Sequence, residues 1–345
     1  MSGLKTLKTR IKSIQTTSKM TNAMRMIAVS NLRKSHQLLL ESYPYLEEST
    51  RMLRRLVRSL SSRGAPLPTI ISGKDNKKKH LIVCITSDQG LCGRFNQTIV
   101  EKTQQIIDFL LSQNVTGVQL VCFGSRGAEL LKKKNPNINI HLVQRQKMEQ
   151  DSLFTDAQNL AHNFVNAFYM NDFDVCTVVY SLFKNAAVQT VQIDQLFPLQ
   201  TFQHENKWQF LMDEKEKAIA LKNKDLKNAN AKLFSFVGNK NFTFLWGQAE
   251  AKAIAEESTR LPTCYDYNIS DAQILDTLLM PFIEAYIYHI LLNSIASESA
   301  MRMMAMEGAS KSASEMIKSL QKKYHRKRQE TVTKDLTEVV AGALN

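Results

Sequence analysis

The sequence predicts an α/β protein in which the N- and C-terminal helices form a long antiparallel coiled coil beside a Rossmann-like α/β middle domain. Apolar residues recur every three or four positions near both chain ends, whereas short apolar runs alternate with helical segments between them. We therefore divide the 345-residue chain into an N-terminal coiled-coil helix (1–60), a linker (61–80), the α/β domain (81–200), an insertion or connection (201–268) and a C-terminal coiled-coil helix (269–345).

The first helix is predicted from a stripe of residues that advances by alternating steps of three and four. The stripe consists of Leu4, Leu7, Ile11, Ile14, Ser18, Thr21, Arg25, Ala28 and Leu32. Such steps keep one face of a helix against a partner helix, which is typical of a coiled coil. We expect Pro44 to bend this helix, because a proline inside a helix removes a hydrogen bond and clashes with the preceding turn.

The middle of the chain changes to a strand pattern. Residues 61–79 are rich in Gly, Pro, Ser and Lys, and we expect them to form an exposed linker. Short apolar runs predict strands at 81–86, 118–123, 138–143, 175–180 and 188–193, with helices at 97–111 and 154–169 and a loop and helix at 124–134. Strands that alternate with helices favour a mainly parallel sheet.

The last helix is predicted over residues 274–341. Its stripe consists of Ala313, Ile317, Leu320, Tyr324, Val332, Leu336 and Val339. As one helix it would reach on the order of 100 Å at 1.5 Å per residue, which is more than the width of a globular domain of this size. The helix must therefore project from the domain, and the N-terminal helix is its expected partner. Residues 201–263 precede it, and we interpret this charged segment as an inserted hairpin or a flap.

Composition limits the partners and the chemistry. The formal net charge of +13 favours a partner with an acidic surface. No run of apolar residues reaches the length that crosses a bilayer, so we expect a soluble or peripheral protein. The five cysteines and the scattered histidines show no metal-ligand spacing, and the cysteines are expected to be free thiols in a reducing compartment.

Two glycine-bearing loops after strands, SDQGLCG and GSRG, loosely match the layout that cradles phosphates. Neither has the spacing of a dinucleotide-binding loop, and the chain has no GxxxxGK[ST] motif, so tight turns explain both loops better. We predict no catalytic residue, no cofactor-binding residue and no metal ligand. The chain is not expected to be an enzyme by itself.

Other interpretations stay open from the residues alone. A basic coiled coil could bind nucleic acid, although the positive charges are interleaved with the seam and are not gathered with stacking aromatic residues. An enzyme built on the α/β domain would instead show tight nucleotide binding. The acid-free, Arg-rich start also imitates a mitochondrial transit peptide.

The chain resembles the gamma subunit of the F-type, proton-translocating ATP synthase in several segments. These are the opening GLKTLKTRIKSIQTTSKMTNAMRMIAVSNLRKS (3–35), TSDQGLCGRFN (86–96), FGSRG (123–127), VVYSLFKNAAVQ (178–189), ASESAMRMMAMEGASKSASEMI (296–317) and RKRQETVTKDLTEVVAGA (326–343). They occur in the order and spacing of that family and cover both ends and most of the middle.

The resemblance implies a rotor shaft without catalytic chemistry of its own. In this family the paired helices turn inside a hexamer of alpha and beta subunits, and the α/β domain lies near the epsilon subunit and the c-ring of the membrane sector. Proton-driven rotation of the ring then changes the conformations of the catalytic beta subunits. The implied partners are thus the alpha, beta and epsilon subunits and the c-ring, with no cofactor.

The resemblance also suggests residues that contact the alpha/beta hexamer. Met24 and Arg25 fall in the segment that faces an acidic loop of the beta subunit, and Arg302, Lys334 and Thr337 match positions of further contacts. Lys334 stands where many members have Gln. Because the family signature begins at the initiator region, we expect a bacterial chain that is peripheral to the cytoplasmic side of the cell inner (plasma) membrane, rather than a mitochondrial one. No cysteine lies within 201–263, so we expect no thiol regulation of the insertion.

Overall fold

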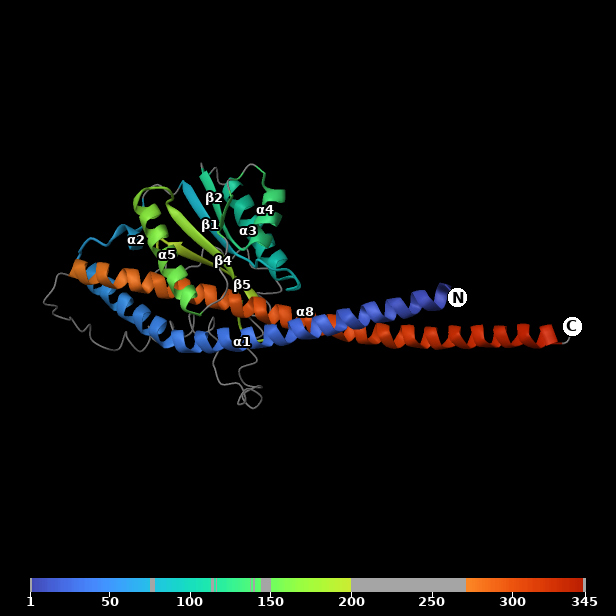
Figure 1. Cartoon of the computed structure of the whole chain (residues 1–345). Coiled ribbons are helices and arrows are strands. Elements are labelled where there is room, and N and C mark those ends of the chain that lie inside the picture. The colour runs from blue at the N-terminus through green and yellow to red at the C-terminus, as the bar shows by residue number, and fades with distance from the viewer. Residues whose placement is uncertain are drawn as a thin grey trace, which may run out of the picture.

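In the computed structural model, an α/β domain lies against a pair of long helices that project away from it (Figure 1). The structure describes residues 2–74, 78–112, 115, 117–136, 138, 140–143, 150–199 and 271–343. The predicted insertion at 201–268 lies wholly outside these residues.

The two long helices are α1 (Ser2–Ser62) and α8 (Asp271–Ala343), and they run antiparallel along one another (Figure 1). Every member of the predicted N-terminal stripe is buried or half-buried, and Ala28 is only 2% exposed. The coiled-coil prediction is therefore confirmed. Pro44 lies inside α1, and the helix changes direction over its C-terminal half (Figure 1).

The C-terminal stripe is only partly covered. Ala313, Ile317, Leu320 and Tyr324 are buried or half-buried, but Val332 and Leu336 are 49% and 59% exposed. The reason is geometric, because α8 continues past the N-terminal end of α1 (Figure 1). The end of α8 thus carries a seam for which α1 supplies no partner.

The sheet has five strands in the order β3-β2-β1-β4-β5. The strands are β1 (Lys79–Ile85), β2 (Gly117–Phe123), β3 (Ile140–Val143), β4 (Val175–Phe183) and β5 (Gln189–Phe197). The first four are parallel, as predicted, whereas β5 is antiparallel to β4. Residues 184–188 explain the exception, since a link this short joins antiparallel neighbours and cannot make a crossover.

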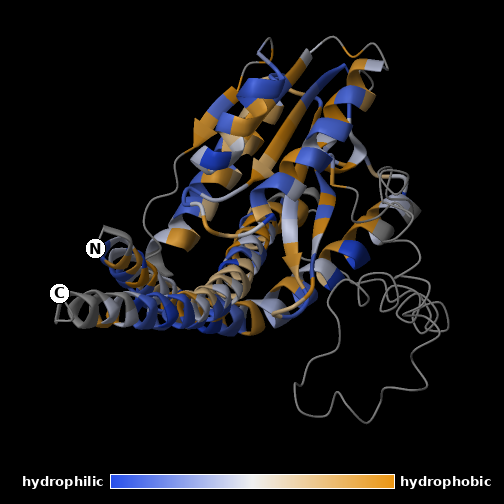
Figure 2. Cartoon of the chain, turned by 90° about the vertical axis from the view of Figure 1, so that its right-hand side faces the viewer, coloured by the Kyte–Doolittle hydropathy of each residue, from blue (hydrophilic) through white to orange (hydrophobic). Residues whose placement is uncertain are grey.

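Helices cover both faces of the sheet. One face packs on α3 (Phe95–Ser112) and α4 (Ser125–Lys134), and the other packs on α5 (Gln150–Tyr169) and α8. Figure 2 shows hydrophobic residues along the strands and mixed hydrophobic and hydrophilic residues on the helices. This burial on two faces is why the strands appear in the sequence as continuous apolar runs.

The exposed-linker interpretation of residues 61–79 is wrong for part of that segment. It contains a short helix, α2 (Thr69–Ser72), whose Ile70 and Ile71 are buried. The N–H of Leu199 donates to the carbonyl oxygen of Ile70 at 2.8 Å, and Lys74 Nζ donates to the carbonyl oxygen of Phe168 at 2.6 Å. The polar composition of the whole segment predicted exposure, but burial of the two adjacent isoleucine side chains is favourable enough to fold this part against the domain.

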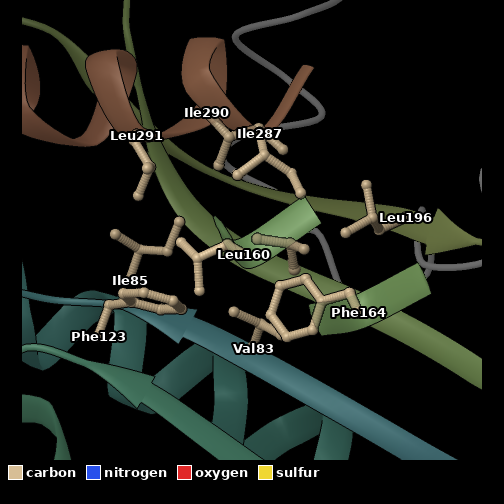
Figure 3. A pocket seen from close by; sticks show the side chains of 10 residues that line it. Val83, Ile85, Phe123, Leu160, Phe164, Leu196, Ile287, Ile290 and Leu291 are labelled. Atoms are coloured by element: carbon tan, nitrogen blue, oxygen red, sulfur yellow. The ribbon is translucent and has the colours of Figure 1, made fainter. Parts of the chain in front are cut away.

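The apolar part of α8 is a core helix of the domain. By length and composition, α8 could cross a membrane, but all residues from 289 to 300 are buried. An apolar cavity of about 10 Å³ lies in the contact between α8, α5 and the sheet (Figure 3). Its lining consists of Val83, Ile85, Phe123, Leu160, Phe164, Val178, Leu196, Ile287, Ile290 and Leu291. This contact is therefore closely packed.

His289 makes the stability of this contact depend on pH. It lies on α8 at 4% exposure, and burial lowers its pKa from 6.5 to about 4. The unfolded chain therefore binds the proton more tightly, so stability is lost as the pH falls through 6.5 toward 4. The shift corresponds to roughly 3 kcal/mol at 1.36 kcal/mol per pKa unit.

We expect the urea midpoint of the chain to fall more steeply between pH 7 and pH 4.5 than that of a His289→Gln variant, as measured by circular dichroism. Parallel pH profiles for the two proteins would contradict this assignment.

Candidate functional site

The candidate functional site is the outer surface of the α1–α8 pair together with the neck, which we define as residues 87–93 and 298–302, where the loop after β1 meets α8. Over the described part of the chain, no group of three or more His, Cys, Asp and Glu side chains could hold a metal ion. The four described cysteines are free, as predicted, and all four are buried.

The helix pair is strongly basic where it projects. On α1 the exposed cations are Lys5, Lys8, Arg10, Lys12 and Lys19, and on α8 they are Lys318, Lys322, Lys323, Arg326, Lys327 and Arg328. Exposed apolar side chains lie among the α1 cations, notably Met20 and Ile27, which are 65% and 62% exposed. Positive charge beside apolar side chains fits a protein partner that offers acidic and apolar groups.

Met24 and Arg25 are both half-buried on α1. Arg25 is held within its own helix, because its Nε and Nη2 donate to Asn22 Oδ1 at 3.3 and 3.2 Å. Its guanidinium is therefore oriented before any partner arrives.

Arg302 is the central residue of the neck. Its Nη2 lies 2.8 Å from Glu298 Oε1, and the two side chains are only 13% and 8% exposed. The same nitrogen donates to the carbonyl oxygens of Gln89 and Gly90 at 3.3 and 3.4 Å. Arg302 thus fastens the loop after β1 to α8 within the chain.

The remaining predicted residues lie at the projecting end of α8. Thr337 is exposed, and its hydroxyl donates to the carbonyl oxygen of Thr333 at 2.5 Å. The side chain of Lys334 lies outside the described residues. Arg302 and Thr337 are 35 residues apart on one helix, which is about 50 Å at 1.5 Å per residue. The structure therefore spreads the predicted contacts along the rod and does not gather them.

The phosphate-cradle layout at the start of α4 is closed by the chain itself. Asp88 Oδ1 accepts from the N–H of Ser125 at 2.9 Å, and the hydroxyl of Thr86 accepts from the N–H of Gly127 at 3.2 Å. A Cβ at Gly127 would lie 2.3 Å from that hydroxyl, so the approach is as close as glycine allows. A carboxylate already occupies the place of an anion at this helix N-terminus, which agrees with the interpretation as tight turns.

Sequence reasoning missed the polar contacts that join α8 to the domain. Asp194 on β5 accepts from Tyr180 Oη at 2.8 Å and from Tyr286 Oη of α8 at 3.1 Å. Loss of water raises the pKa of Asp194, while the hydroxyl hydrogen bonds oppose that rise. Only the spacing of Glu298 and Arg302, four residues apart on a helix, was a visible signal of such a contact.

Comparisons with known proteins agree along the whole chain. A family model described as ATP synthase matches residues 3–344. The ATP synthase gamma chain of Rhodospirillum rubrum is 33% identical over 344 residues, with 99% of each chain covered, and that of Paramagnetospirillum magneticum is 31% identical over 343 residues, again with 99% of each covered. A structure of the central stalk and c-ring of the Tetrahymena thermophila mitochondrial ATP synthase contains a chain with the same fold. It matches at 22% identity and a TM-score of 0.53, over 84% of this chain and 99% of that one.

The neck yields a prediction about stability. An Arg302→Met variant should be less stable by about 3 kcal/mol, because it leaves the buried Glu298 carboxylate without its cation. A Glu298→Gln, Arg302→Met double variant should recover more than half of that loss. Denaturant unfolding of the three proteins checks this, and a double variant as unstable as the single one would show that the ion pair is not the reason.

Proposed function

The chain belongs to the ATP synthase gamma chain family, and from that membership we propose that it is the central rotor shaft of an F-type ATP synthase. As a gamma chain it is a non-catalytic subunit, and it transmits rotation to subunits that make or consume ATP. The single observation that carries the proposal is the antiparallel α1–α8 pair, which projects from the α/β domain as a rod (Figure 1).

The rod has the mechanical properties that a shaft needs. Two helices packed along a continuous seam resist bending better than one helix. The pair is also asymmetric, since α1 carries Pro44 and its N-terminal end does not reach the C-terminal end of α8. An asymmetric rod inside a threefold ring presents a different face to each catalytic subunit. Differential contacts of this kind shift conformational populations.

The partners follow from the same role. We place the projecting α1–α8 pair inside the hexamer of alpha and beta subunits, where its cations face acidic groups of the beta subunit. The α/β domain is placed near the epsilon subunit and the c-ring. Met24, Arg25, Arg302, Lys334 and Thr337 remain the proposed hexamer contacts. Because Arg302 is engaged inside the chain, we expect it to act on the hexamer through the neck as well as by contact.

We keep the five-part division of the chain, with the 201–268 insertion as a connection between β5 and α8. ATP synthase is a membrane-associated complex, and this chain is peripheral in it. We propose the cytoplasmic side of a bacterial plasma membrane, supported by the two bacterial relatives named above.

Observing rotation would test the function directly. The chain, carrying a probe on its α/β domain, is assembled with alpha and beta subunits, and the complex is fixed by its head and supplied with ATP. We expect unidirectional rotation with threefold periodicity. Failure to assemble with alpha and beta, together with DNA affinity that falls steeply with rising salt, would instead support the nucleic-acid-binding alternative.

The continuity of α8 yields a second prediction. An Ile317→Pro variant should break the rod at a local cost of roughly 3 kcal/mol, because Ile317 lies in the half-buried seam of α8. ATP-driven proton pumping by the assembled complex should be lost. Ile317→Ala is the matched control, since it removes seam contacts but keeps the helix. Normal pumping by the proline variant would mean that torque does not pass along α8 at this level.

A further inference from the structure

Near its C-terminal end, one edge of β4 forms hydrogen bonds with side chains of α8 instead of with a neighbouring strand. The pairing of β4 with β1 ends at the pair Cys84↔Val179, whereas β4 continues to Phe183 and stays paired with β5 as far as Gln189. The last residues of β4 therefore extend past the pairing with β1 into the protein interior. Buried backbone groups at such a place need other hydrogen-bond partners.

Two side chains of α8 supply those partners. The hydroxyl of Ser297 donates to the carbonyl oxygen of Ser181 at 3.0 Å, and the N–H of Phe183 donates to Asn293 Oδ1 at 3.4 Å. Asn293 and Ser297 are four residues apart, so they lie on one face of the helix. They are 3% and 0% exposed. Asn293 Nδ2 also donates to the carbonyl oxygen of His289 at 3.0 Å, which fixes the orientation of the amide group.

These two bonds differ in kind from the contacts around them. The apolar packing of α8 on the sheet has no direction, whereas a hydrogen bond is lost outside a narrow range of distance and angle. A shift of α8 by one residue would turn it by about 100° and move it by about 1.5 Å. Both bonds would then break, and the buried carbonyl oxygen of Ser181 and the half-buried N–H of Phe183 would lose these partners.

We propose that Asn293 and Ser297 are positioning residues that set the height and rotation of α8 on the α/β domain, so that torque applied to the domain reaches the rod without slip. This inference rests on the proposed function. Both residues are buried within the chain and act through the docking of α8 on β4.

Ser294 offers a matched control for both. It is 0% exposed like Ser297, but within the described structure its hydroxyl has no hydrogen-bond partner. A Ser294→Ala variant therefore removes a buried hydroxyl from the same helix without removing a bond to β4.

The first experiment measures hydrogen exchange in the full chain. The Phe183 amide should exchange about ten-fold faster in Asn293→Ala than in Ser294→Ala, while amides of β2 exchange equally in both. Equal rates at Phe183 would overturn the proposal, and this outcome does not depend on the rotor function.

The second experiment uses the assembled ATP synthase in vesicles and measures protons pumped per ATP hydrolysed. We expect the Asn293→Ala, Ser297→Ala double variant to lose at least half of this ratio, with a smaller loss of ATP hydrolysis, and Ser294→Ala to match the unmodified chain. If the double variant pumped as many protons per ATP as the Ser294→Ala control, the proposal that Asn293 and Ser297 set the position of α8 would be overturned. If the unmodified chain itself failed to couple pumping to hydrolysis, the rotor function would be rejected, and with it the torque role of these residues.

Discussion

The structure depends on the burial of α8 in two different surroundings. Over residues 289–300 the helix is buried on all sides, between the sheet and its neighbouring helices. Farther along, only a narrow seam contacts α1, and most residues on the other faces are exposed. Because one unbroken helix serves both surroundings, the α/β domain and the rod cannot move independently. Any rotation of the domain about the helix axis must either turn the rod or break the packing between them.

Polar groups give this packing its direction. Along α8, bonds reach the domain from Tyr286, Asn293, Ser297 and Arg302 in turn, to β5, to β4 and to the loop after β1. Each such bond contributes only about 1 kcal/mol to stability, far less than the apolar surface around it. Their effect is on specificity, since they distinguish one register of the helix from neighbouring registers that would bury similar apolar area.

Most of the fold was predictable because its helices and strands show in the local pattern of apolar residues. The stripe from Leu4 to Leu32 has a clear helical period, and β1, β2 and β4 are short apolar runs with few interruptions. The linker was misjudged because Ile70 and Ile71 are only two residues in a polar segment, and their burial depends on distant partners such as Leu199.

The contacts of the candidate site were harder to predict for a related reason. The acceptors of Arg302 are carbonyl oxygens more than two hundred residues away in the chain, and backbone atoms leave no mark in a sequence. The family resemblance suggested the same residue as a hexamer contact, but the structure adds its engagement with Glu298 and the loop after β1.

The part of α8 beyond the end of α1 has a consequence for how this chain is made in the cell. Val332 and Leu336 are exposed on α8, which extends past the N-terminal end of α1. Apolar side chains in such a position promote self-association of newly synthesised copies until another protein shields them. We therefore expect this polypeptide to be synthesised in the same amount as its partners, since surplus copies would aggregate or be degraded.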